Sequence, residues 1–184
     1  AKLAEMLPAA TSRRAGGEPG PALYGWATGQ YRFDRYLSKG DDEGPRILLT
    51  KDVAAIQPAL AEAAATALVR DLVNTPAEDM GPAQLEHEAQ RLAKAHGAEF
   101  KVTHGDALER GFPMVHSVGR AAARSHSPRL IELTWGDPAH PRIALVGKGV
   151  CFDSGGLDIK PSAGMLLMKK DMGGSAHALA LAAL

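Results

Sequence analysis

Apolar residues recur at helical spacing in two stretches of the chain. The first predicts a helix over residues 58–73, because Pro58 suits a first helical turn, where its missing N–H would be unpaired anyway. The sequence Asn-Thr-Pro at 74–76 then ends this helix. A second helix is predicted over residues 82–96, since Gly97 is a good C-terminal stop. Its apolar face carries Leu85, Ala89, Leu92, Ala93 and His96.

Shorter aliphatic runs predict strands, and they alternate with the helical stretches. These runs lie at 45–50, 98–103, 129–135 and 142–148. The sequence Gly-Asp-Pro-Ala-His separates the last two, and this turn chemistry favours antiparallel pairing between them. Residues 11–22 are rich in Gly and Pro and are interpreted as a loop, whereas a helix is expected from Asp171 onward. The alternation from about residue 74 predicts a layered α/β domain.

Composition narrows the class of protein. The 184 residues are 45% hydrophobic, which allows a packed core. Lys+Arg and Asp+Glu are both 21, so charge gives no argument for nucleic acid or an anionic membrane as partner. The single Cys excludes an intrachain disulfide and favours a reducing compartment. No apolar run is long enough to predict a membrane-spanning helix, and residues 1–14 do not resemble a signal peptide.

Residues with metal-binding chemistry gather between positions 146 and 174. Lys148 and Asp153 lie at the end of the last predicted strand and just beyond it, and Lys160 and Asp171 come later in the same stretch. Carboxylates bind divalent ions and one carboxylate can bridge two of them, while a lysine amine can bind when it is neutral. A lysine that stays charged could stabilise an oxyanion. From spacing alone, a structural ion pair between Lys148 and Asp153 remains an equal or better interpretation.

Residues 146–174 follow the order of a known protein-family signature. VGKGVCFDSGGLDIKPSAGMLLMKKDMGG resembles the signature of the leucyl (cytosol) aminopeptidase family. LVNTPAEDM, GFPMVHSVGRA and PRLIELTWG resemble further segments of the same family, so the resemblance covers about residues 58–184. It implies roles for five residues. Lys148 and Asp171 would bind the tighter metal ion, Asp153 would bridge two ions, Lys160 would polarise the substrate carbonyl, and Met168 would line the pocket for the first side chain.

The resemblance also implies an architecture and a function. Residues 1–50 would be the end of a small N-terminal α/β domain, 51–73 a linker helix region, and 74–184 the first half of a mixed-sheet α/β/α catalytic domain. The enzyme would be a cytoplasmic homohexamer that uses two Mn or Zn ions to remove N-terminal, leucine-like residues from peptides. Binding of the substrate's free α-amine to a metal ion would explain why only chain N-termini are cleaved.

The chain departs from the family pattern at several points. Cys151, Asp158 and Leu166 stand where many members have Thr, a small polar residue and Asp. The second family motif, Asn-Thr-Asp-Ala-Glu-Gly-Arg, does not occur in the sequence. That motif would supply two more ligands and a catalytic Arg, so we expect a piece of a longer enzyme that is inactive when isolated.

Alternative interpretations remain open for single residues. Asp171 suits a helix N-cap. Lys169 and Lys170 are interpreted as solvated surface lysines, and Met168 is as compatible with a core position as with a pocket. Cys151 is interpreted as a buried thiol rather than a nucleophile.

Alternatives also remain for the function. A zinc-protease motif at His87-Glu88 fails because Arg91 occupies the second His position. A phosphate-binding loop at Lys148 fails because Gly149 replaces the required Ser or Thr. An inactive relative that acts as a scaffold, or another two-metal hydrolase such as a phosphatase, stays possible on the sequence alone.

Overall fold

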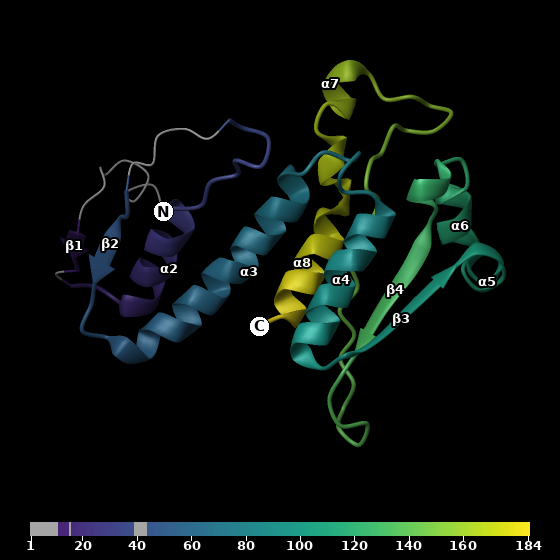
Figure 1. Ribbon diagram of the computed structural model, residues 1–184. Coiled ribbons are helices and arrows are strands. Elements are labelled where there is room, and N and C mark those ends of the chain that lie inside the picture. Colours follow the sequence, from purple (N-terminus) through teal and green to yellow (C-terminus); the bar gives the residue numbers. More distant parts are fainter. Residues whose placement is uncertain (1–10, 15, 39–43) are drawn as a thin grey trace. The chain divides into compact units, whose positions relative to one another are not determined.

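The computed structural model describes residues 11–14, 16–38 and 44–184, and it divides into two compact units. The boundary falls between Asp71 and Leu72, and the second unit runs to Ala183 (Figure 1). Most of the N-terminal stretch that was tested for a signal peptide lies outside the described residues. Together the units make a mixed α/β protein, as the sequence predicts. No helix in the described ranges is both long enough and apolar enough to cross a membrane.

The first unit corrects the interpretation of residues 11–22 as a loop. Strand β1 (Thr11–Arg13) pairs in parallel with β2 (Ile47–Leu49), and helix α2 (Pro19–Gly29) lies between them in sequence. The prolines that looked like helix breakers occupy the first turn of α2, where no N–H is needed. β1 was missed because its partner lies more than thirty residues away, which a local pattern does not reveal.

Helix α3 (Ile56–Asn74) confirms the helix predicted over residues 58–73 and begins two residues before Pro58, whereas its role as a linker between domains stays a prediction. It follows a short 3₁₀ turn, η1 (Val53–Ala55). Two side-chain contacts join α3 to α2 in the first unit. The hydroxyls of Tyr24 and Thr66 lie 3.0 Å apart, and the Arg70 guanidinium donates to the Thr28 carbonyl at 3.0 Å.

Helix α4 (Pro82–His96) follows the end of α3 in the second unit and confirms the second predicted helix. Gly97 ends it in the left-handed conformation, with φ of 65°, as its position predicts. The predicted apolar face is buried at Leu85, Ala89, Leu92 and Ala93. His96 differs, because it is exposed at the end of the helix.

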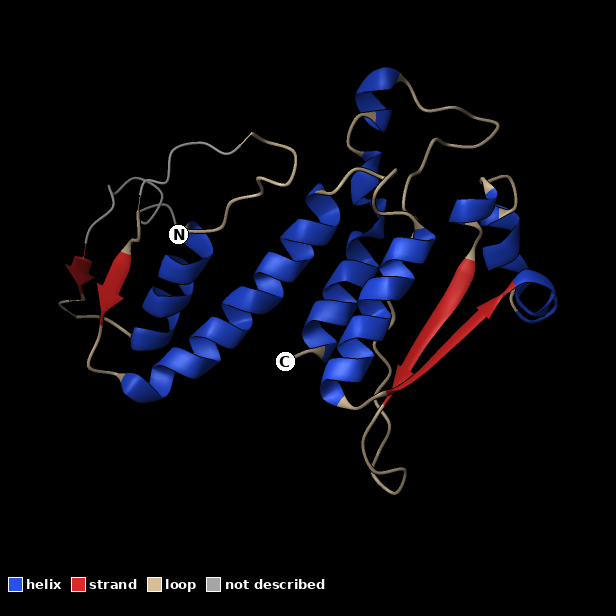
Figure 2. Cartoon of the chain, viewed as in Figure 1, coloured by secondary structure: helices blue, strands red, loops and turns tan. Residues whose placement is uncertain are grey.

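Strand β3 (Glu99–His104) pairs antiparallel with β4 (Arg129–Thr134), and α4 packs against both (Figure 2). Between the strands the chain forms α5 (Gly105–Gly111), α6 (Pro113–Gly119) and η2 (Arg124–His126). A largely buried ion pair between Glu86 and Arg129 ties α4 to β4. The guanidinium also donates to the carbonyl and the hydroxyl of Ser127.

The prediction of a strand over residues 142–148 is wrong. The segment is extended but carries no strand hydrogen bonds in the described chain, and Ile143 and Val146 are 88% and 92% exposed. A strand needs a partner for its backbone groups, and β4 uses β3 as its partner instead. The turn before the segment does form, with the Asp137 side chain accepting from the Ala139 N–H at 2.8 Å.

The second unit ends with three short helical elements. These are α7 (Ser162–Met165), the 3₁₀ helix η3 (Met168–Met172) and α8 (Gly173–Ala182). The interpretation of Asp171 as an N-cap is wrong, because Met172 occupies the cap position of α8 and Asp171 lies inside η3. The helix expected from Asp171 onward is otherwise confirmed.

Candidate metal and catalytic site

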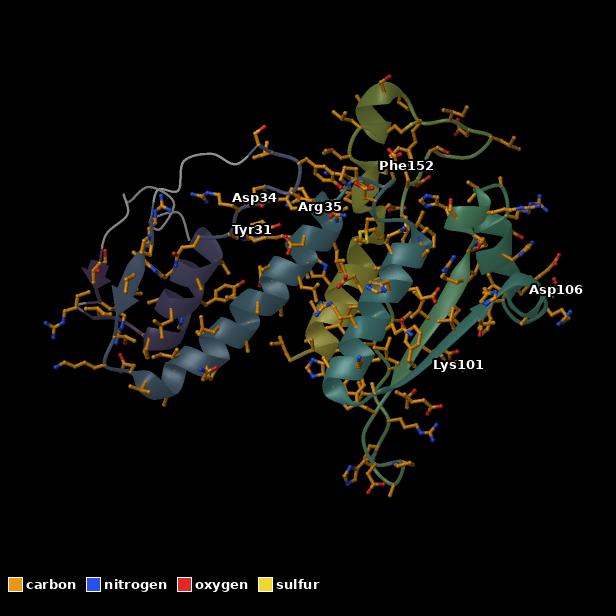
Figure 3. The ribbon with its side chains drawn as sticks, in the orientation of Figure 1. Tyr31, Asp34, Arg35, Lys101, Asp106 and Phe152 are labelled. Atoms are coloured by element: carbon orange, nitrogen blue, oxygen red, sulfur yellow. The ribbon has the colours of Figure 1, made fainter. Side chains whose placement is uncertain are left out.

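Four of the five predicted site residues form one electrostatic cluster. The Lys148 Nζ lies 2.9 Å from the Asp171 Oδ2, and the Lys160 Nζ lies 3.4 Å from the Asp153 Oδ2. The two pairs also influence each other, since Asp153 acts on Lys148 through charge. Figure 3 shows Phe152, the neighbour of Asp153, on the segment that leads to α7, away from Lys101 on β3 and Asp106 on α5. The structure therefore brings together residues that are up to 23 positions apart in sequence.

Local hydrogen bonds set the orientation of Asp153. Its Oδ1 accepts the Gly155 N–H at 2.8 Å. This bond, followed by the contact with Lys160, holds the pKa of Asp153 below its ordinary value. Gly155 has φ of +94°, and a side chain there would meet the Asp158 carbonyl at 2.2 Å. Only glycine fits this turn, so the Gly-Gly pair after Asp153 shapes the site.

Lys148 is held by the start of α8. The Ser175 N–H donates to the Lys148 carbonyl at 2.9 Å, and a Cβ on Gly174 would lie 2.8 Å from the Lys148 amide nitrogen. A Cβ on Gly147 would meet the Gly174 carbonyl oxygen and the Ser175 Cα, both at 2.5 Å. Backbone therefore packs directly on backbone here, and this contact brings Lys148 beside Asp171.

The structure requires glycine at some positions of this stretch and not at others. Gly147 and Gly155 lie where a side chain does not fit, and Gly156 needs glycine for its φ of +74°. A Cβ on Gly149 would make only an ordinary contact, 3.5 Å from the Leu85 side chain. Nothing in the structure explains glycine at position 149.

Replacing Gly147 by alanine is expected to lower the free energy of unfolding by roughly 1–3 kcal/mol, since the new methyl group meets rigid backbone. Gly111→Ala is the matched control, because it lies in the same unit with no atom near its Cβ position. Urea denaturation followed by Trp135 fluorescence, in a Trp26→Phe background, reports on the second unit alone. Equal stability of the two alanine variants would contradict the close packing at Gly147.

Asp171 has the chemistry of a cation ligand. Its side chain is 17% exposed, and its Oδ2 is fully covered without a hydrogen bond of good geometry in the described chain. The nearby Lys148 ammonium balances its charge by proximity, and this polar contact raises the pKa of Lys148. A covered carboxylate oxygen beside one cation fits a divalent ion, with Asp153 and a neutral Lys148 as the other donors.

The donor set in the described chain is nevertheless small. No group of three or more His, Cys, Asp or Glu side chains there is arranged to hold a metal ion. Three donors, of which one is a lysine, are what the cluster provides. Asp158, one of the departures from the family pattern, adds a further carboxylate to this stretch, but its side chain is exposed.

The structure does not join Met168 to the cluster through a described contact. The side chain is half-buried in η3. An apolar hollow in the same unit lies elsewhere, between α4, the end of β4 and α8, and includes Leu133, Trp135 and Leu179. The pocket role of Met168 therefore stays a prediction.

Cys151 is buried, as predicted, and its thiol lies 3.5 Å from the Gly149 carbonyl. Burial raises the pKa of the Cys151 thiol to about 11, and the Arg129 charge opposes this only in part. At neutral pH the thiol stays protonated, which argues against a nucleophile.

The reaction of Cys151 with a disulfide reagent such as DTNB at pH 8 is therefore expected to be about 100-fold slower than that of an ordinary thiol, because so little thiolate is present. In denaturant the rate should return to that of a free cysteine. The Cys151→Ser variant is the blank, since the chain has no other cysteine. Equal rates in the folded and unfolded chain would show that the thiol is accessible and ionisable.

Sequence reasoning missed one residue next to the site. Lys169 was interpreted as a solvated lysine, but its Nζ donates to the Asn74 carbonyl, 95 positions away in the sequence. Lys170 is exposed, as predicted. Nothing in the sequence distinguishes the two adjacent lysines.

Known proteins resemble this chain in sequence and in structure. Residues 67–184 match the family model described as the cytosol aminopeptidase family, catalytic domain. The chain belongs to the cytosol aminopeptidase family. A probable cytosol aminopeptidase of Rhodococcus opacus is 38% identical over 179 residues, which cover 88% of this chain and 35% of the relative. One from Aquifex aeolicus is 39% identical over 160 residues, covering 83% and 32%.

Solved structures of the family share the fold. The cytosol aminopeptidase of Coxiella burnetii superposes with a TM-score of 0.90 at 43% identity, covering 98% of this chain and 40% of that structure. The bottromycin maturation enzyme BotP, solved in complex with Mn, gives 0.79 at 36% identity, covering 96% and 40%. The chain spans about a third of the length of the curated relatives that it matches.

Proposed function

We propose that this chain supplies part of the active site of a metal-dependent aminopeptidase. The observation that carries the proposal is the cluster in which Lys148 meets Asp171 and Lys160 meets Asp153. Membership of the family supports peptide hydrolysis, and the manganese bound to BotP supports a divalent ion. The proposed site of action is the cytoplasm, and the proposed assembly is a homohexamer.

In this proposal Lys148, Asp153 and Asp171 would hold two divalent ions, Mn or Zn, and Asp153 would serve as a ligand to both. Bound ions would activate a water molecule and hold the free α-amine of the peptide. Lys160 is placed to donate to the substrate carbonyl as negative charge develops on its oxygen. Asp153, whose Oδ2 lies 3.4 Å from the Lys160 Nζ, would orient that lysine. Met168 lines the pocket for a leucine-like first side chain.

Metal binding requires Lys148 to lose its proton. The contact with Asp171 raises the pKa of Lys148, so the cluster in the structure favours the charged amine. A divalent ion held by Lys148 and Asp171 would compete with that proton for the amine. Affinity for the ion should therefore rise with pH, by up to about tenfold per pH unit for one released proton.

The isolated 184-residue chain is expected to bind Mn²⁺ weakly and to show no turnover, because its cluster offers three donors and a tight two-ion site needs more. Isothermal titration and a leucine amide assay, each with added Mn²⁺, check this. Turnover by the purified chain, lost in the Asp153→Asn variant, would refute the expectation of inactivity.

The function itself is tested in a longer polypeptide that contains these residues. Leucine amide should be hydrolysed in the presence of Mn²⁺, whereas N-acetyl-leucine amide should not, because its blocked nitrogen cannot bind a metal ion. Hydrolysis of a phosphate ester instead would favour a phosphatase, and no turnover of either substrate would favour a binding or scaffold role. Both of these results would overturn the proposal.

A further inference from the structure

Lys169 joins two segments that lie far apart in the sequence. Its Nζ donates to the carbonyl of Asn74, the last residue of α3, and the lysine side chain is half-buried. The last carbonyls of a helix lack partners within the helix, and a cation is favourable at that end. Both effects favour Lys169 at this position. Nearby, a Cβ on Gly173 would lie 3.9 Å from the Val73 side chain, so the end of α3 also packs against the start of α8.

The geometry of η3 links the Lys169 contact to the direction in which the Asp171 side chain points. A 3₁₀ helix has three residues per turn, so residues three apart share one edge. Lys169 and Met172 form one such edge, and Met172 is fully buried. Met168 and Asp171 form the neighbouring edge. Anchoring the first edge through Lys169 and Met172 therefore fixes the direction in which Asp171 points.

The short helix has little stability of its own. It spans five residues, and 3₁₀ runs of this length have poorer hydrogen bonds than an α-helix. Its place in the unit must come from tertiary contacts on either side of Asp171. Without the Lys169 contact, η3 would lose its anchor on the N-terminal side of Asp171, and rotation about the remaining anchor at Met172 would move the Asp171 carboxylate away from Lys148.

We propose that Lys169 is a positioning residue whose bond to the Asn74 carbonyl holds Asp171 against Lys148. The role of Asp171 as a metal ligand rests on the proposed function. The bond from Lys169 to the Asn74 carbonyl, which we call the tether, does not. Lys169 touches neither substrate nor reacting atoms and acts only through η3.

Lys170 provides a control within the same element. It carries the same charge one residue away, and it is exposed. The test compares Lys169→Met with Lys170→Met in the 184-residue chain, since methionine removes the ammonium and keeps most of the apolar stem. Lys169→Arg restores a charged donor and should restore the contact.

The first readout needs no metal. Amide hydrogen exchange of residues 170–173 should be about tenfold faster in Lys169→Met than in Lys170→Met, because one hydrogen bond from a charged donor is lost. Lys169→Arg should exchange at the wild-type rate. Equal exchange in the two methionine variants overturns the proposal. If Lys169→Met does not fold, as judged by circular dichroism, the arginine variant decides, and faster exchange at residues 170–173 in it overturns the proposal.

The second readout uses Mn²⁺ as a paramagnetic probe, with Mg²⁺ as the diamagnetic blank. Trace Mn²⁺ broadens amide signals near a weak site, and in the wild type those of Lys148, Asp153 and Asp171 should broaden together. Lys169→Met should reduce the broadening at Asp171 about fivefold and Lys170→Met should leave it unchanged, because only the first releases η3.

The two readouts separate the inference from the proposed function. Amide exchange could be faster in Lys169→Met than in Lys170→Met while Mn²⁺ broadens no signals of the wild type. That result would support the tether and contradict the metal site. Broadening that is the same in both methionine variants would support the metal site and overturn the positioning role.

Discussion

Replacing Lys160 by methionine is expected to lower kcat for leucine amide about 10²–10³-fold in an active polypeptide that contains this segment, because a positioned donor to the developing oxyanion is lost. KM should change little, since the contact strengthens only as the reaction proceeds. Steady-state kinetics at saturating Mn²⁺ measure both constants. Asp153 keeps its bond from Gly155 in the variant, so the cluster should hold its shape.

Lys170→Met is the control, because it removes an exposed lysine from the same unit. Its kcat should stay at the wild-type value. A Lys160→Met enzyme with unchanged kcat and a raised KM would show that this lysine binds the substrate without assisting the reaction. A metal titration of both variants shows whether any loss comes from weaker metal binding instead.

Leu108→Ala is expected to lower the free energy of unfolding of the second unit by about 2–5 kcal/mol, because it leaves a cavity where a fully buried side chain was. Leu108 lies in α5, which packs against β3, β4 and α6. Urea denaturation followed by Trp135 fluorescence in the Trp26→Phe background measures the change.

Leu166→Ala is the matched control for that measurement. Leu166 is 78% exposed, so its truncation should change stability by no more than about 0.5 kcal/mol. A loss as large as that of Leu108→Ala would show that Leu166 is covered in solution. A negligible loss for Leu108→Ala would show that α5 contributes little to the core.

The sequence predicts best where local and tertiary preferences agree. Helix α4 has a regular apolar face and a glycine that can adopt the left-handed conformation, and both ends of the helix lie where the pattern places them. The signature from Lys148 to Asp171 also pointed to four residues that the structure brings together, while their roles in metal binding and catalysis stay predictions. A resemblance was needed for this, since spacing alone allowed a simple ion pair.

Prediction failed where the outcome depends on a distant partner. Residues 142–148 have the composition of a strand, yet β4 pairs with β3 and leaves them without a ladder. Thr11–Arg13 forms a strand only because β2 lies beside it. Lys169 and Lys170 are chemically identical, and only the position of the Asn74 carbonyl distinguishes them. Such contacts have no local signal in a single sequence.

The extended segment before Lys148 also determines how this chain can be handled. Ile143, Leu145 and Val146 are exposed, and backbone groups in this stretch have no ladder partner among the described residues. An exposed, apolar, extended segment with unpaired backbone groups can pair with a second molecule, as an open sheet edge does. Concentrated samples should therefore self-associate, and light scattering should rise with protein concentration. Dilute protein, or a lysine placed at Val146, should extend the usable range.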